Sequence, residues 1–212
     1  PTRFPELNWA FQEGGVLWAL NLYSDIIGHY SKRNQLNISN YDPKKLDNNL
    51  IKELFMKYGE SSQINLISQL EQFLSAVGIK DSSGYFEGDE FQDSGISSIE
   101  DIKDIFCSRY FFGCEADDPM NALATKCKPM LGGAEMKAMF ASDIGHWDVT
   151  NMNSVLPDAW ELVEDGLLDS DEFSAFVFGN VVEFYGRVNP SLFEGTTVED
   201  QAGVHLSHGG VM

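Results

Sequence analysis

Residues 136–149, MKAMFASDIGHWDV, contain the side chains best suited to chemistry in this sequence. A short apolar run ends at Ser142 and Asp143, and a loop with Gly145 and His146 follows. A buried strand with a carboxylate at its C-terminal end is a common source of catalytic residues in α/β barrels. Such a carboxylate can bind a divalent metal or accept a proton from a water molecule. We therefore expect Asp143 to have one of these two roles.

Two further predicted strands also end in a carboxylate. Residues 7–12 precede Glu13, and residues 109–115 end at Glu115. A helical pattern follows each strand, and this alternation implies parallel pairing. The carboxyl ends of all three predicted strands would then lie at one edge of the sheet. These strands are residues 7–12, 109–115 and 137–142. The alternative for Glu115 is a cap or ion pair at the helix that follows it.

Periodic apolar patterns predict the helices that must position these strands. They cover residues 16–32, 43–58, 63–77, 98–106, 117–127, 154–164 and 170–185. Residues 80–95 are rich in Asp, Ser and Gly, which predicts an exposed loop. We expect residues 1–195 to form one α/β domain with a helical insertion at about 16–106, and residues 196–212 to be an irregular tail.

Composition narrows the class of protein. The chain has 212 residues, with 43% hydrophobic and 12% aromatic content, which is typical of a globular protein with a substantial core. Its 33 acidic and 14 basic residues leave a net charge of −19. Such a surface repels phosphate backbones and anionic lipids, so we expect neither a nucleic-acid partner nor a membrane partner.

The cysteines and the N-terminal residues indicate the cellular compartment to expect. Three cysteines without metal-ligand spacing do not predict a disulfide framework, which favours a reducing, cytoplasmic setting. No apolar run approaches the roughly 20 residues that a membrane-spanning helix needs. The start of the sequence has neither an initiator Met nor a signal pattern, so we expect it to be part of a longer chain.

One motif resembles a calcium-binding loop but does not fit it. If Gly166 occupied the sixth position of an EF-hand loop, Val163 would occupy the third, where an oxygen ligand is needed. The pattern instead predicts a helix that ends at Gly166 and a new helix capped by Asp169 or Ser170.

Three segments resemble the amidohydrolase superfamily, in particular its amidohydrolase-related (amidohydrolase 2) branch. Residues 140–143, FASD, resemble the last barrel strand of that family, and residues 179–186, GNVVEFYG, resemble its closing helix. Residues 11–15, FQEGG, resemble its sixth strand, where members commonly have His-Gly-Gly. The resemblance covers residues 7–195 and corresponds to the second half of a family member.

The resemblance implies the C-terminal portion of a TIM-type (β/α)₈ barrel with about three parallel strands. Asp143 would bind a divalent metal, zinc or manganese, and would handle the proton of the attacking water. Glu13 stands where members often have a metal-binding His. This departs from the family pattern, but a glutamate can also bind zinc or manganese, so Glu13 is the second expected metal ligand. The His-x-His of the first strand and the ligand of the fifth have no counterpart in these residues.

The leading functional expectation is a metal-dependent hydrolase in which metal-activated water attacks an amide, ester or lactone. His146, Glu115 and Trp18 are the candidate contacts to a small-molecule substrate, although His146 could equally pack against Trp147. One alternative is non-oxidative decarboxylation of a small unsaturated or aromatic acid on the same scaffold. Another is a non-catalytic binding or assembly module. Unpaired sheet edges would favour a homo-oligomer, and the isolated chain is expected to be inactive.

Overall fold

The computed structural model describes residues 2–34, 36–41, 45–64, 67, 69, 72 and 91–209. The chain divides into two compact units, which are described separately below. The first contains Pro1–Ile27 and Ser98–Met212, and the second contains Gly28–Ser97. No helix within the described residues is both long enough and apolar enough to span a membrane.

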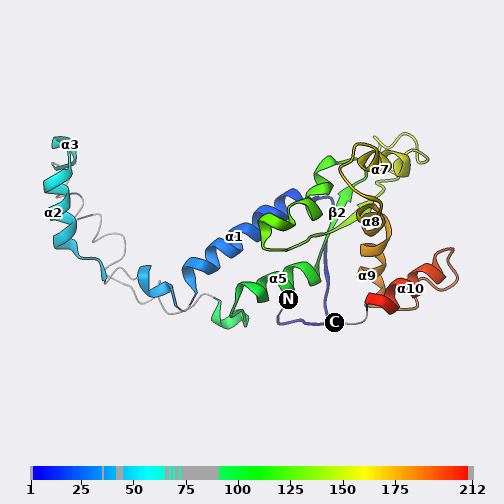
Figure 1. Ribbon diagram of the computed structural model, residues 1–212, viewed down its shortest axis with the longest axis horizontal. Helices are drawn as coiled ribbons and strands as arrows, with labels where there is room; N and C mark the ends of the chain where they lie inside the picture. The colour runs from blue at the N-terminus through cyan, green and yellow to red at the C-terminus, as the bar shows by residue number, and fades with distance from the viewer. Residues whose placement is uncertain are drawn as a thin grey trace. The chain divides into compact units, whose positions relative to one another are not determined.

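A three-stranded parallel sheet is the centre of the first unit (Figure 1). Its strands are β1 (Trp9–Phe11), β2 (Tyr110–Glu115) and β3 (Lys137–Ala141), in the order β1-β2-β3. The register pairs Phe11 with Phe112, and Phe112 in turn with Ala138. The predicted strands, their parallel pairing and the α/β class are therefore confirmed, and the eight-stranded barrel stays a prediction.

Aromatic side chains hold helices against this sheet. Phe112 is fully buried and lies within 6.0 Å, between ring centroids, of Phe11, Trp18 and Phe106. Trp18 belongs to α1 (Leu17–Arg33), and Phe106 belongs to α5 (Ile99–Arg109). Burying one such ring contributes about 1.5–3 kcal/mol to the free energy of unfolding. This cluster fastens the helix after β1 and the helix before β2 to the same strand.

Capping boxes define the starts of two helices in the first unit. Ser98 and Asp101 form a capping box at the start of α5. Asp169 and Glu172 form another at the start of α8 (Ser170–Ser174), after α7 (Val155–Glu164) has ended before Gly166, which has a φ of 70°. The predicted helix–glycine–helix arrangement is thus confirmed in place of a calcium loop.

The predicted helix at residues 117–127 is replaced by three shorter pieces between β2 and β3. These are the 3₁₀ turn η5 (Pro119–Ala122), the single turn α6 (Leu123–Lys126) and the 3₁₀ turn η6 (Lys128–Leu131). Pro129, at the start of η6, cannot donate an amide hydrogen and so opposes a continuous α-helix. Asp118 caps η5 by accepting from the Met120 amide at 2.9 Å.

A continuous helical segment packs against β3. It consists of α8, the π-helical turn η7 (Ala175–Gly179) and α9 (Asn180–Gly186). Asn180 Nδ2 donates a hydrogen bond to the carbonyl oxygen of Ala138 at 2.7 Å. The ring of Phe176 contacts that of Phe140. The side-chain amide of Asn180 therefore supplies a hydrogen-bond donor to a backbone carbonyl of β3.

Replacing Asn180 with Ala should destabilise the first unit by about 1–3 kcal/mol, because the Ala138 carbonyl would be left without a donor. Asn153→Ala is the matched control, since Asn153 is exposed in the loop before α7. Denaturant unfolding followed by Trp fluorescence measures the difference, because all 4 Trp residues lie in the first unit. Equal stability of the two variants would contradict this role for Asn180.

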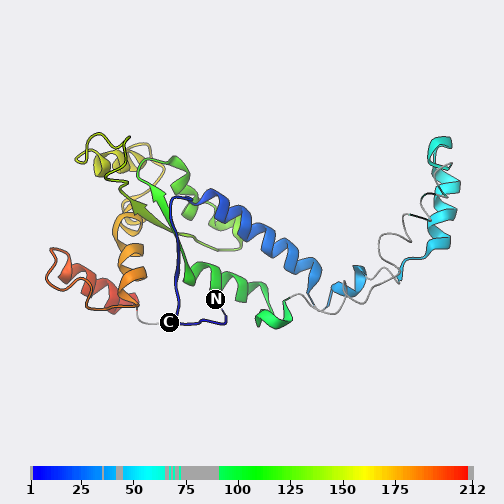
Figure 2. The same ribbon diagram turned by 180° about the vertical axis from the view of Figure 1, so that it is seen from behind.

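The C-terminal tail is not irregular, and the prediction for residues 196–212 is wrong over Glu199–Gly209. These residues form the helix α10, which Figures 1 and 2 both show beside α9. Ala202 is buried, and the side chains of His205 and Leu206 lie over Gly179 and Gly186. Two glycines seven residues apart share one helix face, which lets α10 approach closely. The local composition of the tail did not reveal this packing partner.

Adding a methyl group at Gly186 should weaken this contact. A Cβ atom there would lie 2.6 Å from Leu206 Cδ1, so Gly186→Ala overpacks the interface. In contrast, a Cβ atom at Gly203 in α10 meets nothing within 4 Å. Gly203→Ala should stabilise by about 0.5–1 kcal/mol through helix propensity. Trp-fluorescence unfolding should rank Gly186→Ala below Gly203→Ala by about 1–3 kcal/mol, and the reverse order would contradict the packing.

The described residues of the second unit are mostly helical. They form η1 (Ile38–Tyr41), α2 (Asn48–Tyr58), α3 (Ser61–Ile64) and η4 (Gln92–Ser94). Asp47 caps α2 by accepting from the Asn49 and Leu50 amides, so this helix starts five residues later than predicted. The predicted start at Asp42-Pro43, most of the helix at residues 63–77 and most of the loop at 80–95 lie outside the described residues.

Candidate metal centre

The chain turns sharply just beyond the carboxyl ends of β1 and β3. Glu13 has a φ of 58° and Asp143 a φ of 48°, and they are the two non-glycine residues with positive φ in the described part of the chain. The left-handed region is sparsely populated for residues with a Cβ atom and costs free energy there. The sequence predicts both as site residues because each follows the end of a strand. The structure places both at the same edge of the sheet.

The loop after β3 brings three possible ligands together. One atom each from Asp143, His146 and Asp148 lie within 4.8 Å of one another. His146 Nδ1 lies 3.2 Å from Asp143 Oδ2 and 3.1 Å from Asp148 Oδ1. The His146 amide also donates to the Asp143 carbonyl at 3.1 Å, and Gly145 between them has a φ of 107°. The turn thus folds the imidazole back between the two carboxylates.

These carboxylates change the titration of His146. The hydrogen bond with Asp148 raises the pKa of His146 above its usual value, and the negative charges of Asp143, Asp148 and Glu13 raise it further. A proton and a metal cation compete for the imidazole, because only the neutral ring is a ligand. Metal affinity at this cluster should therefore fall as the pH falls through the raised pKa.

A hollow of about 350 Å³ lies beside the cluster. The acidic residues that line it are Glu115, Asp117, Asp143, Asp148 and Asp158. No Lys or Arg is present among the described residues of this lining. Such an arrangement produces a negative potential, which attracts cations and repels anionic ligands.

The structure does not bring all of the predicted site residues together. Glu13 is near enough for its charge to act on His146, but it is not part of the group within 4.8 Å. Glu115 lines the hollow, and Asp118 rather than Glu115 caps the following helical turn. His146 contacts the two carboxylates, whereas the neighbouring Trp147 is 87% exposed, so the alternative of a ring packed on Trp147 is not observed.

Trp18 occupies a packing position. Its ring lies against Phe11 and Phe112, and a Cβ atom at Gly14 would approach its Nε1 to 2.5 Å. This nitrogen is buried and has no hydrogen-bond partner among the described residues. The predicted contact between Trp18 and substrate stays a prediction.

Asp148 is the residue that sequence reasoning missed. The spacing Asp-x-x-His-x-Asp from Asp143 to Asp148 was visible in the sequence. A short loop with Gly145 can turn all three side chains toward one point. This spacing together with the glycine could have identified Asp148 as a third ligand.

Comparisons with known proteins do not assign this chain to a family. Models of protein families, curated proteins and solved structures all gave no match to it.

The pKa of His146 provides a direct test of the cluster. In metal-free protein, an NMR titration should place this pKa above 6.5, and Asp148→Asn should lower it by removing the hydrogen bond and the charge. Asp158→Asn is the control, because Asp158 lines the same hollow but is not among the groups that raise the pKa. An equal shift in both variants would indicate diffuse charge rather than this specific contact.

Proposed function

We propose that Asp143, His146 and Asp148 bind a divalent cation and that the chain forms part of a metal-dependent hydrolase of the amidohydrolase type. The observation that carries this proposal is the convergence of three ligand atoms at the carboxyl edge of a parallel sheet. Reactive sites of parallel α/β proteins are built at this edge.

The donor set is suitable for such a cation. Catalytic zinc sites commonly have three protein ligands, drawn from imidazole and carboxylate groups, and leave one position open. The three side chains are between 36% and 56% exposed, so a water molecule or a substrate has access. Two carboxylates and one imidazole accommodate zinc, and the high carboxylate content also suits manganese.

The residues of the chain have distinct roles in this proposal. A bound cation would polarise a substrate carbonyl and lower the pKa of a water molecule. Asp143, at the end of β3, accepts the proton of the attacking water. Asp148 orients the imidazole of His146 through the contact at Nδ1.

The acidic hollow bears on the class of substrate. Five carboxylates repel an anion, so the lining favours a neutral amide, ester or lactone. A decarboxylase would have to admit a carboxylate substrate into the same space. The hydrolase is therefore the better-supported alternative on this scaffold.

Calorimetric titration of zinc and manganese into the purified chain tests the metal site. We expect one ion per chain, and Asp148→Asn or His146→Ala should weaken binding about tenfold or more because a ligand is lost. Asp158→Asn should bind within about twofold of the unmodified chain. A comparable loss in Asp158→Asn, or no saturable binding, would contradict the proposed centre.

The hydrolase reaction is tested separately in the intact protein. Neutral ester, amide and lactone substrates should be hydrolysed in the presence of the metal, and Asp143→Asn should lower kcat by about 10²-fold or more through loss of the proton acceptor. Retained metal binding with unchanged kcat in this variant would show that Asp143 does not handle the proton. Carbon dioxide release from a small acid would favour the decarboxylase instead.

A further inference from the structure

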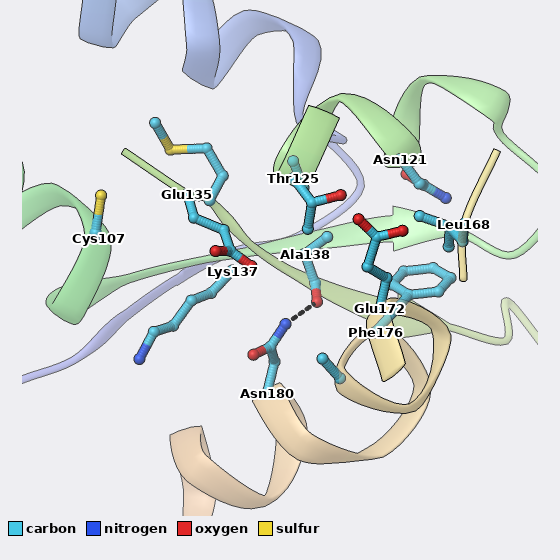
Figure 3. A pocket seen from close by; sticks show the side chains of 13 residues that line it. Cys107, Asn121, Thr125, Glu135, Lys137, Ala138, Leu168, Glu172, Phe176 and Asn180 are labelled. Carbon is cyan, nitrogen blue, oxygen red and sulfur yellow. Dashed lines mark hydrogen bonds between the residues drawn. The ribbon is translucent and has the colours of Figure 1, made fainter. Parts of the chain in front are cut away.

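A second cavity, of about 230 Å³, lies beside β3 and is shown in Figure 3. Each charged side chain that lines it has a partner of opposite charge. The pairs are Glu172 with Lys126, Glu135 with Lys128, and Lys137 with Glu183. This pairing leaves the second cavity without the unbalanced charge that would select a ligand.

The C-terminal helix offers metal-binding side chains instead. An open groove of about 530 Å³ lies where α10 meets the segment of α8 and η7. Its lining includes Phe178 on that segment and both His205 and His208 on α10. None of these residues belongs to the Asp143 cluster or to the acidic hollow. Two of the four histidines in the chain thus share one groove, away from the proposed metal centre.

The two histidines are neighbours on one face of α10. They are three residues apart in a helix that runs from Glu199 to Gly209, and side chains at this spacing have Cβ atoms about 5–6 Å apart. Bonds of about 2.0–2.1 Å join an imidazole nitrogen to a metal such as zinc. Two imidazoles at this spacing can therefore reach a single ion between them. The helical conformation of the tail is what makes the His-x-x-His spacing a pair of ligands.

A hydrogen bond prepares the ring of His208 for a metal. Its Nδ1 lies 2.7 Å from the carbonyl oxygen of Val204, which can only accept, so Nδ1 carries the proton. The neutral ring then presents the lone pair of Nε2. Metal-binding histidines commonly donate their other ring nitrogen to a backbone carbonyl in this way, which fixes the tautomer and the orientation of the ring. His208 is exposed, so an ion can approach it.

Packing positions the ring of His205. It lies edge-to-face with Phe178, at 6.1 Å between ring centroids. It also covers Gly179, where an added Cβ atom would lie 3.0 Å from Cε1 of the ring. Neither ring nitrogen of His205 has a hydrogen-bond partner among the described residues, and the residue is only partly buried in the groove. His205 is therefore held in place with its nitrogens unoccupied, which suits a second ligand.

We propose that His205 and His208 together bind one transition-metal cation, such as nickel, copper(II) or zinc. Imidazole nitrogen suits these ions, whereas magnesium, calcium and manganese prefer oxygen ligands. The pair does not belong to a three-ligand group of His, Cys, Asp and Glu in the described part of the chain, so water molecules complete the coordination. Asp200 lines the same groove, and its negative charge favours a cation there.

This site would act on the helix itself and does not depend on the proposed hydrolase. An ion held by residues three apart links successive turns of α10 near its end. His205 also packs over Gly179, so the ion would hold the last turn of α10 against the segment that contacts β3. The consequence is a C-terminal helix whose local stability depends on a metal.

NMR of the histidine rings during a Ni²⁺ titration tests the pair. The full chain carries His146→Ala, so that the centre around Asp143 has lost its imidazole. Saturable binding should broaden the ring signals of His205 and His208 together, because the paramagnetic ion lies beside both, and leave the ring of His29 sharp. No saturable broadening, broadening of one ring of the pair alone, or equal broadening of His29 would overturn the proposal.

Variants in the same His146→Ala chain measure the contribution of each ligand by calorimetry. His208→Gln and His205→Gln should each weaken Ni²⁺ binding about tenfold or more, because one imidazole is lost. His29→Gln is the matched control and should bind within about twofold of the parent chain. Mg²⁺ should bind at least about tenfold more weakly than Ni²⁺, since the ligands are nitrogen atoms. Equal weakening by His208→Gln and His29→Gln would overturn the assignment to this groove.

His208→Gln is the decisive variant, because the exposed ring of His208 can be replaced without disturbing the packing over Gly179. Circular dichroism checks that this variant keeps its helix content, whereas His205→Gln removes a packed ring and can loosen α10. Ni²⁺ should also slow amide hydrogen exchange in the last turn of α10 in the parent chain but not in His208→Gln. If folded His208→Gln binds Ni²⁺ with full affinity, or if Ni²⁺ leaves exchange in α10 unchanged, the proposal is wrong.

Discussion

Parallel pairing of β1, β2 and β3 is the constraint on which the rest of this structure depends. Parallel strands present their carboxyl ends at one edge, so the charge of Glu13 acts on His146 although the two residues are more than a hundred positions apart. The pairing also buries β2 on both sides, since Phe111 and Phe112 face opposite ways and are both fully buried. The parallel pairing of the strands therefore produces both the hydrophobic core around β2 and the acidic edge at the carboxyl ends.

The helices around the sheet are held by a few specific contacts. Asn180 joins the segment of α8, η7 and α9 to the Ala138 carbonyl, and the glycines of that segment admit α10 at close range. The π-helical turn ends at Gly179, directly before Asn180, and such turns are frequently found near functional sites. In this chain it carries Phe176, which packs on Phe140 of β3 and lines the second cavity.

The two cavities differ in how their negative charge is balanced. In the hollow beside Asp143 the carboxylates face one another without a basic lining residue among those described, which suits a strongly charged metal cation. In the second cavity, Lys126 and Lys128 pair with Glu172 and Glu135, so the remaining potential is weaker.

The amino-acid sequence by itself determined the strands and most of the helices, and it identified Asp143 as a candidate site residue. Apolar runs that end in a carboxylate, together with helical periodicity between them, are local signals that survive folding. The capping of α8 by Asp169 and the end of α7 before Gly166 were likewise readable, because caps depend on neighbouring backbone groups.

Only the tertiary structure determined which residues form the site. It also determined that the C-terminal tail forms a helix and where the second cavity lies. Asp148 joins the cluster because a positive φ at Asp143 and Gly145 reverses the loop, and side-chain spacing alone does not specify such dihedral angles. The helix α10 forms over Gly179 and Gly186, whose free surface exists only after α9 has folded. Asn121 and Glu172 line one cavity although they are 51 positions apart in the sequence, and proximity of this kind arises from packing rather than from local propensity.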